Sequence, residues 1–307
     1  ALHGPAPLKA ARPGGGSGIQ GMRALAEYVM RGRREALLVS TMAVALPMFF
    51  WLGAAVVGLV TLRKGVREGV FVMLWALLPA AAVAYFGEIM PVAALLGITA
   101  VAWVLRLTVS WPWALCASSL LGVVLGGSLL TIGRGYLAQV EKLFADLVAG
   151  IGQQAAQKGA ETVALTPPGA SDIAGMFGLI LAVTLVVCLI IARWWQAALY
   201  NPGGFRAEFH ALRLDRVQAL ALLLLAFGFG AMGEGFRLWA WMPLVPLLFA
   251  GIALVHALAA ARGRGGWLGL FYAALLVLAP LKQFVVVLAA MDSLLDIRGR
   301  WLKKPGG

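Results

Sequence analysis

Long runs of apolar residues, separated by short charged segments, make up most of this 307-residue chain. A membrane-spanning helix needs about 20 such residues, with a range near 17–25. Eight runs approach or exceed that length, at residues 36–62, 70–86, 90–107, 112–132, 173–192, 217–232, 242–260 and 267–290. The pattern predicts an all-α fold, a polytopic bundle of transmembrane helices.

Composition supports the same interpretation. Hydrophobic residues make up 62% of the chain and charged residues 12%, against about 45–50% and 25% in soluble domains, and the mean hydropathy is +0.89. We therefore expect one transmembrane domain over residues 22–304. Residues 1–21, rich in glycine and proline, are interpreted as a disordered tail before a natural start at Met22, and residues 305–307 as a short tail.

Basic residues predict the orientation, because lysine and arginine collect in cytoplasmic loops. Clusters flank both the first and the last apolar run, and each of these runs contains a central proline, Pro47 or Pro280. One interpretation is six full spans bracketed by two terminal segments that bend back at their prolines. The alternative is eight plain spans that leave both basic ends outside. Either way both termini lie on the same side, and the bent-segment interpretation places them in the cytoplasm of a bacterial cell, at the inner membrane.

The net charge of +12 is explained by this orientation, and no basic domain outside the membrane is available to hold nucleic acid. Cys116 and Cys188 both lie inside apolar runs and indicate neither a disulfide framework nor a metal pair. Catalytic motifs and metal-ligand spacings are absent from the sequence. We therefore predict no enzyme, no cofactor and no metal site.

The longest polar tract covers residues 133–172 and is expected on the extracytoplasmic side. Apolar residues recur in it at helical spacing, from Tyr136 and Val140 to Leu147 and Ile151. This indicates an amphipathic helix. The helix is predicted either to lie on the membrane surface or to act as a lid over a cavity between the spans.

Charged residues near membrane depth are candidates for ligand contact, because burying a charge in lipid is costly. Lys282 follows Pro280 by two residues, at the tip of the last segment if that segment bends. Glu88 and Glu234 lie at outer ends of spans beside glycines, where they would ring an outward-facing cavity. Lys282 is interpreted either as a structural partner of such a carboxylate or as a ligand-binding group.

The insert at residues 198–216 separates two spans. Asn201 and Pro202 end one helix, two glycines permit a sharp reversal, and Phe205, Phe209 and Leu212 then form one apolar stripe. We predict a short interfacial helix that lies flat on the cytoplasmic surface. Three roles stay open for it: a plain elbow, a docking surface for a cytoplasmic partner, or a contact with lipid headgroups through Arg206 and Arg213.

Three segments carry a resemblance to a known family: "LPMFFWLGAAVVGLVTLRKGVREG" (46–69), "NPGGFRAEFHALRL" (201–214) and "MDSLLDIRGR" (291–300). Together they resemble the YybS-like family of uncharacterised bacterial membrane proteins, over most of the chain after Met22. The resemblance implies a fold similar to the substrate-binding subunits of energy-coupling-factor vitamin transporters. Those subunits bind a small molecule within six helices and are driven by partner ATPases. No binding residue carries over from the family.

Two functions are therefore expected to compete. The first is a small-molecule-binding or transport subunit, with an outward-facing cavity under the 133–172 tract. The second is a membrane scaffold that docks a cytoplasmic or envelope-synthesis partner through the helix at 205–216. The small-residue motifs Gly122–Gly126 and Ala54–Gly58 allow close helix approach and are typical of a compact bundle in the lipid bilayer.

Overall fold

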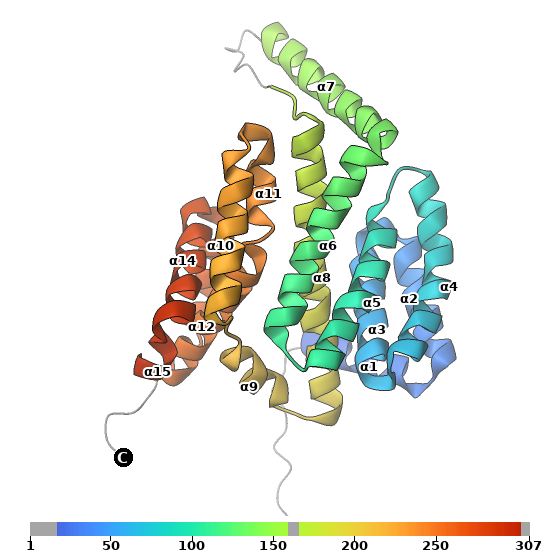
Figure 1. The fold of residues 1–307 in the computed structure, drawn as a ribbon. Helices are drawn as coiled ribbons and strands as arrows, with labels where there is room; N and C mark the ends of the chain where they lie inside the picture. The colour runs from blue at the N-terminus through green and yellow to red at the C-terminus, as the bar shows by residue number, and fades with distance from the viewer. Residues whose placement is uncertain (1–16, 159–165, 302–307) are drawn as a thin grey trace, which may run out of the picture.

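A computed structural model describes residues 17–158 and 166–301, and every regular element in those two ranges is a helix. The helices stand side by side in a bundle, with α7 (Arg134–Gln157) at one end and α9 (Gly204–Ala211) and α15 (Ile297–Trp301) at the other (Figure 1). Four helices are long and apolar enough to cross a membrane, or up to seven when each of three bent pairs counts as one span. The predicted all-α bundle of a multi-pass membrane protein is confirmed at this level.

The central helix of the bundle is α8 (Ala170–Tyr200), whose 31 residues extend over about 46 Å at a rise of 1.5 Å per residue. Three helices pack along it: α3 (Phe50–Lys64), α5 (Met90–Thr108) and α6 (Trp111–Thr131). Its inward face, including Leu185, Leu189 and Trp195, is fully buried. The other elements are therefore arranged around α8.

The crossing of α6 and α8 requires glycine, because the two backbones nearly touch. A Cβ atom added at Gly122 would lie 2.5 Å from the carbonyl oxygen of Gly178, and a Cβ at Gly178 would lie equally close to the Gly122 oxygen. One turn further along α6, a Cβ at Gly126 would lie 3.1 Å from the Ala174 oxygen. The small-residue motif Gly122–Gly126 therefore forms the α6–α8 interface, where small residues allow close packing in lipid.

The first apolar run does not continue as one helix. It divides into α2 (Arg33–Ala45), a single 3₁₀ turn that begins at Pro47, and α3. Helix α3 folds back onto α2, because a Cβ at Gly53 would lie 2.9 Å from the Ser40 carbonyl oxygen. At the other end Arg33 forms an ion pair with Glu68, its Nε donating to Oε2 at 2.7 Å. This part of the chain is therefore a hairpin that enters and leaves at one end of the bundle.

The last apolar run also breaks at its proline. It divides into α13 (Trp267–Val277) and α14 (Ala279–Leu295), which are bent by 114° at Leu278. Pro280 lies in the first turn of α14, where its missing N–H costs no hydrogen bond. Helix α14 packs closely on α12 (Val245–Ala261): a Cβ at Gly251 would lie 2.4 Å from the Val285 carbonyl oxygen.

The remaining apolar runs form α4 (Val66–Tyr85), α10 (Arg216–Ala231) and α12, the last preceded by a short α11 (Arg237–Trp241). Trp239 of α11 is buried against α8, and its indole N–H donates to the Ser171 carbonyl at 2.9 Å. Trp239 thus attaches α11, and with it the start of α12, to the central helix α8.

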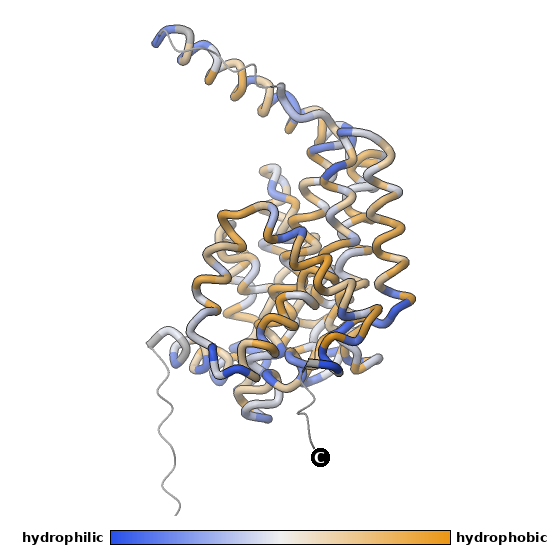
Figure 2. Tube along the Cα trace, turned by 90° about the vertical axis from the view of Figure 1, so that its left-hand side faces the viewer, coloured by the Kyte–Doolittle hydropathy of each residue, from blue (hydrophilic) through white to orange (hydrophobic). Residues whose placement is uncertain are grey.

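Helix α7 projects away from the bundle (Figures 1 and 2). Its first turn is anchored, because Leu137 is buried and the Tyr136 hydroxyl donates to the Gly87 carbonyl at 3.0 Å. Further along, Leu143, Leu147 and Ile151 are exposed. The tract therefore contains a helix, and these three apolar side chains are uncovered by the rest of the protein.

The predicted tails lie largely outside the described residues. Helix α1 (Ser17–Arg31) begins five residues before Met22, so residues 17–21 are helical, contrary to the interpretation of 1–21 as a disordered tail. Its buried residues Ala26 and Val29 pack into the core. Residues 1–16, part of the 133–172 tract, and the C-terminal tail at 305–307 are not described.

Replacing Gly122 by alanine is expected to lower the melting temperature, because the new methyl group meets the α8 backbone. Overpacking of this kind costs about 1–3 kcal/mol. The matched control is Gly127→Ala on the same helix, where an added Cβ meets no heavy atom within 4 Å. Alanine favours a helix over glycine by about 1 kcal/mol, so this variant should be unchanged or more stable. Thermal unfolding in one detergent measures both, and equal melting temperatures would contradict the close crossing.

Candidate functional site

The insert between α8 and α10 forms a sharp elbow. Helix α8 ends at Tyr200, Pro202 cannot continue it, and Gly203 has a φ of +87°, a left-handed conformation that favours glycine. The eight residues of α9 then run beneath the bundle (Figure 1). The sequence therefore predicts the turn and the short helix correctly.

The apolar stripe of α9 faces the protein. Phe209 is 8% exposed and Leu212 3% exposed. Phe205 is half-buried, stacks on Phe209 with ring centroids 5.6 Å apart, and meets the edge of Trp111. These side chains pack into or against the core, because the elbow closes one end of the bundle. They are therefore not available as an exposed docking surface.

Aromatic rings from four helices form a continuous row above the elbow, which we call the aromatic row. It consists of Trp111, Phe205, Phe209, His256, Tyr272 and Phe271. Successive ring centroids lie 5.4–6.2 Å apart, in the range in which aromatic pairs attract one another. His256 Nε2 and the Tyr272 hydroxyl are hydrogen-bonded at 2.7 Å. The row ties α6, α9, α12 and α13 together at this end.

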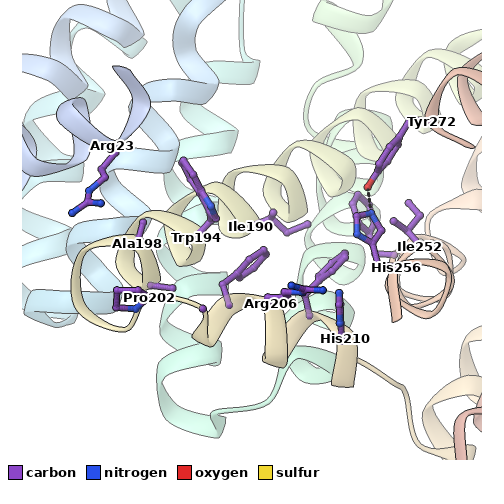
Figure 3. Close-up of a pocket in the computed structure, with 15 residues that line it drawn as sticks. Arg23, Ile190, Trp194, Ala198, Pro202, Arg206, His210, Ile252, His256 and Tyr272 are labelled. Atoms are coloured by element: carbon purple, nitrogen blue, oxygen red, sulfur yellow. Dashed lines mark hydrogen bonds between the residues drawn. The ribbon is translucent and has the colours of Figure 1, made fainter. Parts of the chain in front are cut away.

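A cavity of about 610 Å³ lies along the aromatic row, between α8, α9 and α12, and we call it the elbow cavity (Figure 3). Its volume falls within the roughly 300–1,000 Å³ of small-molecule sites. Its wall is mainly apolar, with Ile190, Trp194, Phe249 and Ile252 beside the row. Polar groups are few: Arg23, Arg206, His210, His256 and Tyr272.

A second hollow of about 420 Å³ adjoins the elbow cavity. It shares Arg206, His210 and His256 with the elbow cavity and is otherwise lined by Ala260, Gly263, Gly265 and Leu268. The rings of His210 and His256 have centroids 6.4 Å apart. Arg206 and the two histidines therefore stand where the two hollows meet.

Glu208, on the other side of α9, is part of a separate polar cluster. It pairs with Arg193, whose Nε donates to the carboxylate at 2.9 Å, and it accepts a weaker bond from the Trp111 indole at 3.4 Å. Arg193 also donates to Gln196 at 2.7 Å. This cluster joins α9 to α8 and α6, and its charges are already balanced.

The C-terminal segment clamps the elbow from below. Arg298 pairs with the buried Asp292 at 2.9 Å, and its guanidinium also donates to the carbonyl oxygens of His210 and of Leu212, the latter at 2.5 Å. Arg213 pairs with Asp296 at 2.5 Å. Burial lowers the pKa of Arg298, while Asp292 acts in the opposite direction. Two of the three segments that carry the family resemblance, 201–214 and 291–300, therefore bind each other.

The three residues predicted to contact a ligand lie in separate places. Glu234 is exposed and pairs with Arg237 at 3.0 Å, Glu88 is exposed in the turn between α4 and α5, and Lys282 is half-buried in the first turn of α14. Lys282 makes no ion pair or hydrogen bond within residues 17–158 and 166–301, and none of the three lines the elbow cavity. Their ligand-binding role stays a prediction.

Sequence reasoning missed most of the cavity wall, because its residues come from distant segments. His256 stands alone in its apolar run, and only the fold brings Tyr272 and Phe209 to it. The signal available in the sequence was Trp194, whose place beside the elbow indicated the depth of the insert in the membrane but did not indicate a cavity. In the described parts of the chain no three His, Cys, Asp or Glu side chains are grouped to hold a metal ion.

Comparison of the chain with protein-family models, with curated proteins and with solved structures gives no match.

Replacing Arg298 by glutamine is expected to destabilise the elbow, since Asp292 is left buried without its charged partner. Breaking a buried pair in this way costs about 3–5 kcal/mol. The variant should melt at a lower temperature and be cleaved faster by trypsin at Arg213 and Arg216. Arg300→Gln, two residues further on at an exposed position, is the control and should behave as the unmodified protein. Equal resistance of the two variants to trypsin would contradict a stabilising role for the Arg298 contacts with the elbow.

Proposed function

We propose that the chain is a bacterial inner-membrane protein with six full spans and two re-entrant hairpins, its basic end in the cytoplasm. The supporting contacts join the ends of many helices at one level: Arg33 to Glu68, Arg106 to the Leu62 carbonyl, and Arg63 over the Tyr200 ring. Hydrophilic residues also gather at this lower end (Figure 2). With both hairpins bent, every basic cluster falls on one side, as the positive-inside rule favours.

Under this topology, α9 and α15 lie at the cytoplasmic interface and α7 on the outer side. We expect α7 to rest on the extracytoplasmic surface of the inner membrane, since its exposed leucines need an apolar contact. The elbow cavity then opens at the cytoplasmic end, and not outward under the 133–172 tract as the sequence led us to expect. None of the cavities described above is lined by α7.

Single cysteines test this topology in a protein whose Cys116 and Cys188 are replaced by alanine. A membrane-impermeant maleimide added to intact cells should label a cysteine at Gly150 of α7, but not at Lys64 after the first hairpin or at Arg300 after the second. All three positions should react once the membrane is permeabilised. Labelling of Arg300Cys but not Lys64Cys in intact cells would show that the last segment spans the membrane.

We propose, as the function, that the protein binds an amphipathic small molecule in the elbow cavity. The observation that carries this proposal is the combination of about 610 Å³ of mainly apolar space with a few polar groups, all but Arg23 at one end (Figure 3). Such a site orients a ligand that has an apolar body and a polar head group. The role agrees with what the YybS-like resemblance implies, a transporter-like binding subunit that works with a coupling module.

A scaffold that docks a cytoplasmic partner is the alternative. The structure leaves it a smaller surface than expected, because Phe209, Leu212 and Leu214 are buried. The surface that remains consists of Arg206, exposed at the edge of the elbow cavity, and the outward Ala207 and Ala211 of α9. A partner on this surface would bind through charge and small residues, with no large apolar anchor.

Filling the cavity tests the binding function directly. Ala198 lines the elbow cavity from α8 and is half-buried, so Ala198→Phe should occupy the space without breaking the helix. With the neutral amphiphile farnesol at a hundredfold excess over its Kd, we expect the melting temperature of the unmodified protein to rise by about 5 °C, and that of A198F not to rise. Ala211→Phe, on the outward side of α9, is the matched control and should keep the shift. Equal shifts in both variants would place binding elsewhere.

A further inference from the structure

Three arginines around the elbow are neutralised by carboxylates, and Arg206 is not one of them. Arg193, Arg213 and Arg298 are each paired with a carboxylate, Glu208, Asp296 and Asp292 respectively. The remaining elbow carboxylate, Asp215, caps α10 by accepting from the Gln218 backbone N–H at 2.7 Å. Arg206 makes no ion pair with any carboxylate in the described part of the chain.

This unbalanced arginine stands at the junction of two hollows, and neither hollow has an aspartate or glutamate in its wall. The groups beside it are His210 and His256, and a neutral imidazole offers one N–H donor and one acceptor nitrogen. The positive charge at this junction is therefore that of Arg206, and without an acidic neighbour in either wall it attracts an anion and repels a cation. Arg23, the other arginine of the elbow cavity, lies apart from this group (Figure 3) and is paired with Glu27 at 3.0 Å.

The rest of the elbow cavity suits a hydrocarbon chain. Beyond the Arg206 end the wall includes Phe209, Ile252, Phe249, Ile190 and Trp194, all apolar or aromatic. Burying a chain against such a wall gains roughly 25 cal/mol per Å² of apolar surface. The space therefore has a positively charged end and an apolar length.

We propose that the ligand of the elbow cavity is a single-chain amphiphile with a phosphate monoester head, an inference that rests on the binding function proposed above. The head accepts hydrogen bonds from the Arg206 guanidinium and from His210, and the chain lies along Ile252, Phe249 and Trp194. A phosphate monoester fits better than a carboxylate, because it offers three oxygens to this group of donors and carries up to two charges. His256 Nε2 is occupied by its hydrogen bond to Tyr272, so His256 forms the wall beside the head.

Farnesyl phosphate, farnesol and farnesoic acid share one chain and differ in the head, so they separate the contributions. We would titrate the full chain in lipid nanodiscs with each compound and follow tryptophan fluorescence, with protein-free nanodiscs as the blank. The expected result is a Kd for farnesyl phosphate at least tenfold lower than for the other two. Excess inorganic phosphate should not displace it, because the chain contributes most of the contact.

The variant Arg206→Gln should lose the tenfold preference while it still binds farnesol. Arg216→Gln is the matched control, since Arg216 is exposed at the same end and lines neither hollow. Equal affinities for the three compounds, an unchanged preference in R206Q, or displacement by inorganic phosphate alone would overturn the phosphate-chain ligand and leave the binding function standing. Binding of none of the three compounds would instead overturn the binding function.

Discussion

The close crossing of α6 and α8 is the contact on which the rest of the structure depends. Between helices in lipid no hydrophobic force acts, so association relies on close packing and on polar contacts. At Gly122 and Gly178 each backbone approaches the other too closely for any side chain. Once α8 is fixed in this way, α3 and α5 pack on one part of it, and Trp239 fastens the start of the second half to it. The length of α8 then carries the chain to the elbow, where the cavity forms.

A second constraint acts at the elbow, where the chain leaves regular helix and exposes backbone carbonyls. The carbonyls of His210 and Leu212 lie at this break, and Arg298 satisfies both. A buried guanidinium needs a counter-ion, and Asp292 provides it. The C-terminal segment is thus a structural part of the cavity floor, because it holds in place the helix that carries Arg206 and Phe209.

The two hairpins explain why the cavity lies at the basic end. Each hairpin has both of its ends there and its helix break at the far tip, so loops and charged side chains are concentrated at the basic end (Figure 2). The opposite end carries exposed Glu88 and Glu234 and the projecting α7. The proposed ligand site therefore lies where the fold supplies both donors and apolar walls.

The sequence by itself determined the all-helical class, the approximate limits of most apolar helices, the breaks at Pro47 and Pro280, and the turn at Pro202 and Gly203. These features are local: they follow from runs of apolar residues and from the missing N–H of proline. Only the tertiary structure decided that the Phe205–Phe209 stripe faces inward, that Arg298 reaches the elbow, and that His256 meets Tyr272. A period of apolar residues shows that one face of a helix is covered, but lipid and protein cover it equally well, so the sequence alone does not distinguish them.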